Sequence, residues 1–158
     1  LNEKCLRNFD GSIDKQSAFT DYLGKDGKFA YYEDYSNLTP HYRLDTQLYV
    51  LIGLYDWSQL DAPNSSKQIA KESYDKGVEM LKRTLPIYDL NGYLTGDLMH
   101  LSEGQLVALD SDDKFAKCIV MLKAIYEQSG DEKIKAFYGK YCNFMMDKFY
   151  KQHDVLLK

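Results

Sequence analysis

Hydrophobic residues recur at helical spacing in four long segments of this chain. Residues 41–60, 61–86, 111–130 and 131–152 each place apolar side chains three or four positions apart, which is the period of an amphipathic helix. In the second segment lysine, glutamate and aspartate fill the remaining positions, which predicts an outer helix with one apolar face. The pattern predicts a mainly α fold.

The first of these segments contains the most apolar run, LYVLIGLYDW, from Leu48 to Trp57. This run is too short to cross a bilayer, which needs about 20 apolar residues, and it does not alternate as a half-buried strand does. Apolar residues lie on more than one of its faces, so we expect an inner helix that neighbours cover nearly all round. Trp57 should pack in the core or at its rim.

Local signals predict where the other helices begin and end. Asn64 or Ser65 can cap the second helix, and Pro86 should end it. Ser111 should cap the third helix and Gly130 should stop it. The short SGD connection then predicts that the last two helices form an antiparallel hairpin.

The remaining segments predict short extended pieces. Residues 17–35 place aromatic residues on both sides of GKDG, a turn-forming cluster, which indicates a β-hairpin. LNGY, within residues 90–93, indicates a second turn between extended pieces, and residues 1–15 suggest only a helical turn. We therefore predict one domain over residues 1–158, an incomplete α/α toroid (barrel) of antiparallel helix pairs with one or two short β-hairpins.

Composition narrows the possible partners and chemistry. The net charge of −4 argues against a nucleic-acid footprint, which needs a basic surface. Cys5, Cys118 and Cys142 form no zinc spacing with the three histidines, and the last two are expected to be small buried hydrophobes. With no phosphate-binding or dinucleotide motif either, we predict no metal, no cofactor and no membrane span.

The chain opens on LNEKC without a methionine, as a piece of a longer protein would. It shows no targeting segment, so the sequence predicts no compartment.

Five motifs carry a resemblance to a known family. In order they are EDYS (33–36), LDT (44–46), LIGLYD (51–56), LPIYD (85–89) and GDLMH (96–100). Together they resemble the C-terminal helical region of D-glucuronyl C5-epimerases over about residues 17–150. The resemblance implies an α/α barrel, a glycan that contains uronic acid as partner, and either an upstream β-rich domain or a homodimer.

The resemblance also implies a chemistry, inversion at C5 of a uronic acid by removal and re-addition of a proton. Such a reaction needs two acid/base groups and a cation that neutralises the substrate carboxylate. Tyr35 stands where the family has a catalytic tyrosine. The family's next tyrosine and its arginine are Gly96 and Met99 here, and a further tyrosine falls near Lys114.

A rearranged site could still perform this isomerase reaction. Tyr35 could act with His100, because histidine ordinarily titrates near pH 6.5, or with Tyr93. Arg43 or Lys114 could replace the lost cation. The predicted site residues are Tyr35 and His100 as catalytic groups and Arg43, Asp45, Tyr93 and Lys114 as substrate-binding groups.

Two alternatives stay open. One is a carbohydrate-binding α/α domain that has lost the family's catalytic residues, in which tyrosine rings stack on sugar faces. The other is a polysaccharide lyase or hydrolase on the same scaffold, since fold does not fix function. A hydrolase would need two carboxylates about 5 to 10 Å apart, for which Glu33, Asp34 and Asp45 are candidates.

Overall fold

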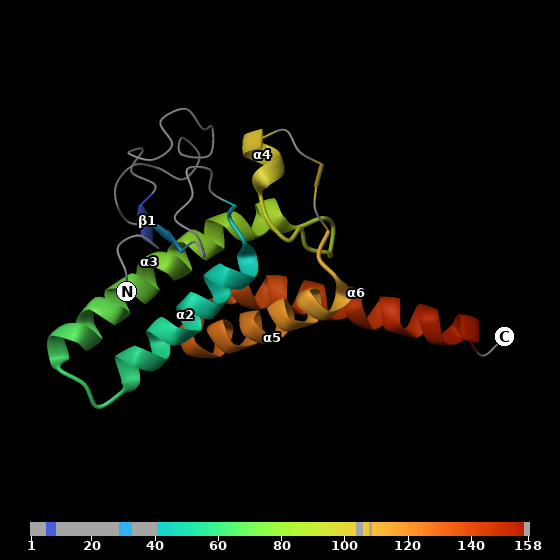
Figure 1. The fold of residues 1–158 in the computed structure, drawn as a ribbon. Coiled ribbons are helices and arrows are strands. Elements are labelled where there is room, and N and C mark those ends of the chain that lie inside the picture. Colours follow the sequence, from blue (N-terminus) through green and yellow to red (C-terminus); the bar gives the residue numbers. More distant parts are fainter. Residues whose placement is uncertain (1–5, 9–28, 33–40, 104–105, 108, 157–158) are drawn as a thin grey trace.

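The computed structural model describes residues 6–8, 29–32, 41–103, 106–107 and 109–156 (Figure 1). Most of these residues are helical, which confirms the mainly α prediction. The helices are α2 (Leu44–Gln59), α3 (Asn64–Tyr88), α4 (Met99–Glu103), α5 (Asp112–Ser129) and α6 (Glu132–Leu156), and the strands are β1 (Leu6–Asn8) and β2 (Ala30–Tyr32).

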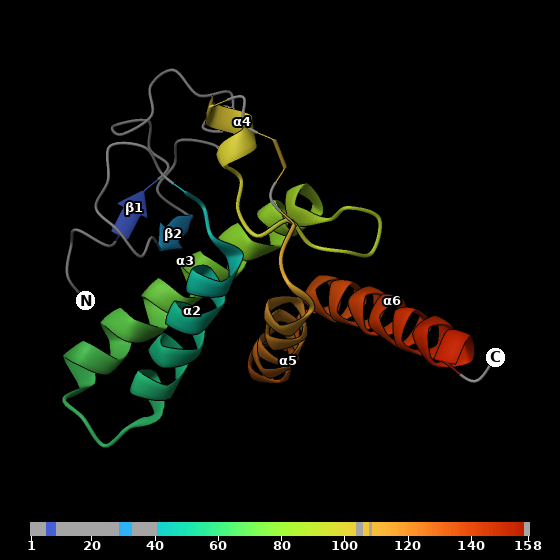
Figure 2. The same cartoon turned by 45° about the vertical axis from the view of Figure 1, so that its right-hand side comes forward.

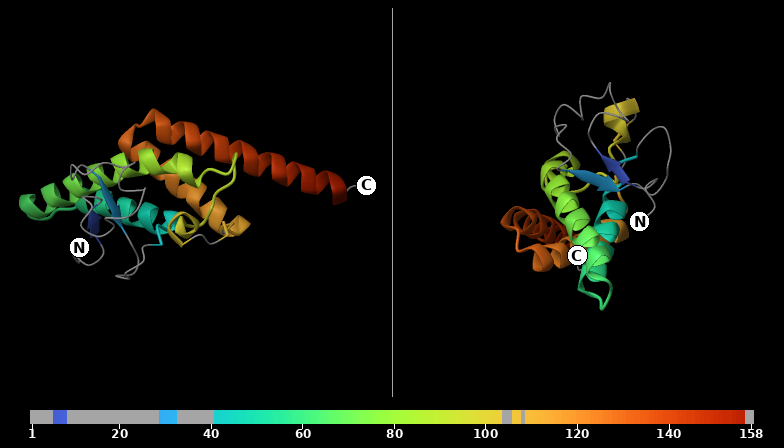
Figure 3. Two further views of the ribbon diagram at one scale, coloured as in Figure 1. Left: turned by 90° about the horizontal axis from the view of Figure 1, so that it is seen from above. Right: turned by 90° about the vertical axis from the view of Figure 1, so that its left-hand side faces the viewer.

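The long helices form two antiparallel pairs. α2 runs down to a short loop and α3 returns beside it (Figure 2). α5 and α6 form the second pair, joined at Gly130. α2 packs against both α3 and α5, so it is the helix of the first pair that contacts the second pair. The C-terminal half of α6 extends past the other helices (Figure 3), and Met146, Phe149 and Tyr150 on this half are exposed.

α2 is an inner helix, but one of its faces is open. Leu44, Leu48 and Leu51 are fully buried. In contrast, Tyr49 and Trp57 are 59% and 51% exposed. The prediction that neighbours cover this helix nearly all round, with Trp57 in or beside the core, was therefore wrong. α3, α5 and β2 cover the other faces, and no element within the described residues covers this one.

The predicted ends of α5 are confirmed. The Ser111 hydroxyl accepts a hydrogen bond from the Lys114 amide, and Gly130 adopts a left-handed conformation with φ of 67°. The predictions for α3 were wrong at both ends. Pro63 precedes the helix without a side-chain cap, and Pro86 lies inside its last turn, because the helix continues to Tyr88.

The β-structure differs from the prediction. β2 pairs antiparallel with β1, with Leu6 opposite Tyr32, so residues 6–8 form a strand where we expected a helical turn. Residues 17–28 and 33–35, which would complete the predicted hairpin, lie outside the described residues. The turn in LNGY is confirmed, because Asn91 and Gly92 have φ of 58° and 105° and the bridge from Asp89 to Leu94 closes it.

A single buried glutamine joins β2 to the first helix pair. The Gln47 side-chain oxygen accepts a hydrogen bond from the Tyr32 amide at 2.8 Å. Its nitrogen donates to the carbonyl oxygens of Ala30 at 3.3 Å and Gly77 at 3.2 Å. Because Gln47 is fully buried, this polar side chain satisfies backbone groups that have no access to water.

Candidate functional site

Three chain segments meet at the N-terminal ends of α2 and α5. The Leu98 amide donates to the His41 carbonyl, which ties the segment before α4 to the segment before α2. A β-bridge between Thr95 and Leu109 ties the same segment to the one before α5. Charged side chains from all three segments gather here, and we call Arg43, Asp45, Asp97, Asp110 and Lys114 the charged cluster.

Arg43 and Asp45 form an ion pair at the start of α2. The Arg43 Nη2 atom lies 2.7 Å from Asp45 Oδ2, and its Nε atom lies 3.2 Å from Oδ1. Both side chains are partly exposed. The pair holds the guanidinium group at the start of α2, where it stays partly exposed.

The backbone before Arg43 adopts an unusual conformation. Tyr42 has φ of 52°, although it is not a glycine, and such strain persists only where the surroundings hold it. The Tyr88 hydroxyl donates to the Tyr42 carbonyl and accepts from the Tyr31 hydroxyl at 2.7 Å. This buried chain of tyrosines holds the turn that orients Arg43.

Asp110 is a partly buried carboxyl group of the charged cluster, and its position depends on a glycine. A Cβ atom at Gly96 would lie 2.5 Å from Asp110 Oδ1, so this carboxyl group occupies the space that a side chain at position 96 would need. Burial raises the pKa of Asp110, and Asp45 and Asp97 raise it further, while Lys114 and Arg43 lower it. A carboxyl group with a raised pKa beside two cations is suited to proton transfer.

Cys118 lies one turn after Lys114 on α5 and is fully buried. Burial raises the pKa of its thiol to about 12, with smaller contributions from Asp110 and Asp45. The prediction that it is a small buried hydrophobe is confirmed, and its thiol is unsuited to nucleophilic chemistry.

Tyr93 supports the charged cluster from outside. Its hydroxyl lies 2.7 Å from the Asp110 carbonyl oxygen and 3.0 Å from Asp112 Oδ1, and its ring packs on Phe115 with centroids 4.5 Å apart. Burial, followed by Asp112, raises its pKa to about 12. This phenol joins the turn after α3 to the start of α5.

The structure thus brings together three of the residues predicted from the sequence, Arg43, Asp45 and Lys114. His100 lies on α4, just after the segment that carries Asp97, and its Nδ1 atom is buried without a hydrogen-bond partner in the described part of the chain. Tyr35, the other predicted catalytic group, lies outside the described residues.

Sequence reasoning missed Asp97 and Asp110. Both precede a helix, and Asp97 accepts a hydrogen bond from the Met99 amide as a helix-capping residue would. Asp110 directly precedes the capping Ser111, so the sequence pattern indicates only the start of a helix. The only signal was an acidic residue four positions before Lys114, which is too common to single out a site.

Two further findings concern metals and membranes. Among the described residues, no three histidine, cysteine, aspartate or glutamate side chains lie close enough to hold a metal ion. None of the helices described here combines the length and the apolar character that a membrane span requires.

Comparison with known proteins identifies the relatives of this chain. The family described as D-glucuronyl C5-epimerase C-terminus matches residues 3–143. A protein of Caenorhabditis elegans named D-glucuronyl C5-epimerase is 32% identical over 126 aligned residues, and the match covers 75% of this chain and 20% of that protein. The chain therefore spans about a fifth of the length of this relative.

Proposed function

The chain belongs to the family described as D-glucuronyl C5-epimerase C-terminus, and we propose that it acts on a uronic acid within a polysaccharide. In this proposal a base removes the C5 proton and an acid returns a proton to the opposite face. The C5 proton is acidic only because a carboxylate is attached to that carbon, so the developing charge must be stabilised.

The charged cluster supplies the groups that this chemistry needs. Arg43 and Lys114 would bind the substrate carboxylate and stabilise the charge that builds on it when C5 loses its proton. Asp110 would be one acid/base group, because burial raises its pKa while two cations stand beside it. Tyr35 or His100 would be the second group on the opposite face of the sugar ring.

The observation that carries this proposal is the contact between Asp110 and Gly96. At residue 96, where the resemblance implies a tyrosine, the partly buried Asp110 carboxyl group takes the space of a Cβ atom. One acid/base group would thus lie beside the backbone position of another, near the cations that an anionic substrate requires.

The test is proton exchange at C5. The protein is incubated with a glucuronic acid polymer in deuterated water, and deuterium at C5 is measured by NMR. Exchange with inversion supports the epimerase reaction. Exchange with a new double bond would instead show a lyase, and binding without exchange would show a carbohydrate-binding domain.

Two pairs of variants locate the site. Asp110→Asn should abolish exchange, whereas Asp113→Asn, on an exposed residue of the first turn of α5, should leave it unchanged. Arg43→Gln should weaken polymer binding, with the exposed Lys117→Gln as its control. Full exchange in Asp110→Asn would remove this carboxyl group from the mechanism, and Tyr35→Phe asks the same question of the phenol.

We also propose that residues 1–158 form one domain and that its helix pairs are consecutive parts of an α/α toroid. The two antiparallel pairs and the inner position of α2 support this arrangement. A single cooperative transition in calorimetry, with equal calorimetric and van't Hoff enthalpies, is expected for one domain. Two separated transitions would contradict it.

A further inference from the structure

The last helix contacts the same turn that supports the charged cluster. A Cβ atom at Gly92 would lie 2.9 Å from the Phe144 ring on α6, and this ring packs edge-to-face on Tyr93 with centroids 5.6 Å apart. Lys140, one turn earlier on α6, forms an ion pair with Asp89, whose carboxylate also accepts a hydrogen bond from the Gly92 amide at 2.9 Å. α6 therefore holds the turn that carries Tyr93.

Lys148 follows Phe144 by one turn of α6 and brings a positive charge to Tyr93. Its ammonium group lies 5.2 Å from the centre of the Tyr93 ring and forms an ion pair with Oδ1 of Asp112, at the start of α5. This ion pair joins the start of α5 to the second half of α6. The family match covers residues 3–143, so Lys148 lies beyond the matched residues.

The Tyr93 hydroxyl has one proton and two acceptors within reach. The Asp110 carbonyl oxygen lies 2.7 Å away, and Asp112 Oδ1 lies 3.0 Å away. A phenol has a single proton to donate, and a carboxylate is a stronger acceptor than a backbone carbonyl group. Without a cation beside the carboxylate, the hydroxyl would therefore donate to Asp112.

Lys148 changes this competition, because it binds the same carboxylate oxygen. Asp112 Oδ1 accepts hydrogen bonds from both the ammonium group and the phenol, and both lower the pKa of Asp112, with the larger effect from Lys148. A carboxylate whose charge a lysine already neutralises competes less strongly for the phenol proton. Burial raises the pKa of Tyr93 to about 12, so this proton stays on the phenol and is available to the Asp110 carbonyl group.

We propose that Lys148 is a positioning residue, which directs the Tyr93 hydroxyl to the Asp110 carbonyl group. The carbonyl and carboxyl groups of Asp110 belong to one residue, so loss of this hydrogen bond would let the carboxyl group move relative to the rest of the charged cluster. A displacement of about 1 Å at a catalytic group can slow a reaction about a hundredfold. The effect on C5 exchange rests on the proposed function, whereas the hydrogen bond does not.

The hydrogen bond is tested by NMR of the Asp110 carbonyl carbon, whose resonance responds to a donor at its oxygen. Tyr93→Phe gives the resonance without the bond. Lys148→Gln should shift the resonance toward that position, whereas Lys148→Arg, which retains the charge, should not. Adding Asp112→Ala to Lys148→Gln removes the competing acceptor and should restore the original resonance. If the lysine only docked α6 on its neighbours, this second substitution would restore nothing.

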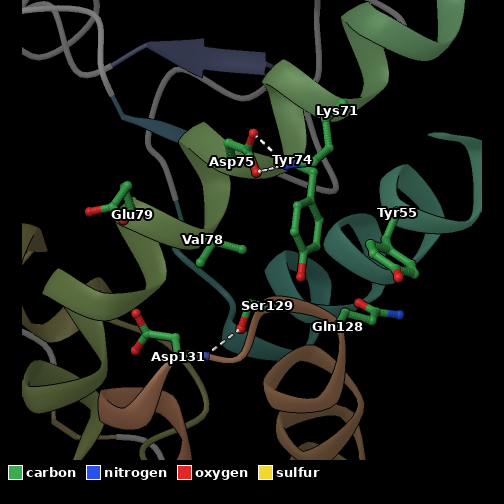
Figure 4. A pocket seen from close by; sticks show the side chains of 9 residues that line it. All are labelled: Tyr55, Lys71, Tyr74, Asp75, Val78, Glu79, Gln128, Ser129 and Asp131. Atoms are coloured by element: carbon green, nitrogen blue, oxygen red, sulfur yellow. Dashed lines mark hydrogen bonds and ion pairs between the residues drawn. The ribbon is translucent and has the colours of Figure 1, made fainter.

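The same variants are compared in the C5-exchange assay. Lys148→Gln should slow exchange by about ten- to a hundredfold, and the added Asp112→Ala should recover it. Lys71→Gln is the matched control, because it removes an ion pair of the same kind, with Asp75 on α3 beside the cavity of Figure 4. This variant should exchange as the unchanged protein does, because α3 carries none of the charged cluster.

The two measurements separate this proposal from the proposed function. An unmoved Asp110 resonance in Lys148→Gln, or one that Asp112→Ala does not restore, would overturn the proposal. A shifted resonance with undiminished C5 exchange would overturn the positioning role. If the resonances behave as expected while the unchanged protein shows no exchange, the proposed function fails, and the control of the hydrogen bond by Lys148 stands.

Discussion

Replacing Gly77 by alanine should destabilise the protein, because α2 and β2 approach α3 closely at this residue. A Cβ atom on Gly77 would lie 2.4 Å from Leu51 Cδ2 and 2.9 Å from Tyr32 Cε2. Both of these side chains are at least 99% buried, so neither can move into solvent. The new methyl group must therefore separate the helices or distort both side chains.

The size of the effect follows from two opposing contributions. Alanine in place of glycine stabilises a helix interior by about 0.5–1 kcal/mol. Overpacking a closed core costs about 1–3 kcal/mol and occasionally more, and the 2.4 Å contact belongs at the upper end of that range. We expect Gly77→Ala to lower the free energy of unfolding by about 2–2.5 kcal/mol, which is about 4–10 °C in Tm for a chain of this size.

The chain provides two matched controls. Gly53 in α2 and Gly139 in α6 also lie inside helices, and a Cβ atom there would meet nothing within 4 Å. Gly53→Ala and Gly139→Ala should each stabilise the protein by about 0.5–1 kcal/mol. Urea and thermal unfolding, followed by far-UV circular dichroism, measure all three. If Gly77→Ala is as stable as its controls, the close approach of α3 to α2 and β2 is wrong.

Three further predictions follow from single contacts. Gln47→Leu leaves the Tyr32 amide and two carbonyl groups without their partner, so urea unfolding should show a loss of about 3 kcal/mol, and an unchanged midpoint would contradict this role. Ser111→Ala removes the cap of α5 and should cost about 1 kcal/mol in the same assay, whereas Ser65→Ala should cost less, because no side chain caps α3. The pKa of Asp110 is higher in the folded than in the unfolded protein. The folded state therefore takes up this proton first as the pH falls, and the free energy of unfolding rises until the pH is also below the unfolded pKa. The Tm difference between Asp110→Asn and the unchanged protein should therefore favour the variant at neutral pH and shrink toward acidic pH, and a difference constant with pH would refute this.

Much of the helical structure could be predicted, because its signals are local. For α5 a cap, an apolar stripe and a stop residue lie within one segment, and each acts on backbone groups a few positions away. The helix α3 shows where such signals fail. Its start has no side-chain cap although Asn64 and Ser65 were available, and the helix continues through Pro86 to Tyr88 although proline removes a backbone hydrogen bond to the preceding turn.

Features that depend on distant residues could not be predicted. β1 was assigned as a helical turn because its pairing with β2 joins residues more than 20 positions apart, and three residues carry too little pattern to indicate a strand. Likewise, an almost wholly apolar helix cannot reveal which of its faces is open. That face, with Tyr49 and Trp57, is defined by where α3, α5 and β2 pack.

The charged cluster contains residues of both kinds, those with local sequence signals and those whose role depends on distant residues. Arg43, Asp45 and Lys114 were predicted from motifs near them in the sequence, and the structure adds that two separate helix ends bring them together. Asp110 could not be found in this way, because the property that distinguishes it comes from Gly96, a residue whose contribution is the absence of a side chain. From the sequence alone, Gly96 indicates the loss of the tyrosine that the family resemblance implies at this position. In the fold, that same absence admits a carboxyl group, lets it be desolvated and places it beside two cations. A glycine at a position where a family resemblance implies a tyrosine is therefore weak support for lost activity until the atoms that occupy its space are known.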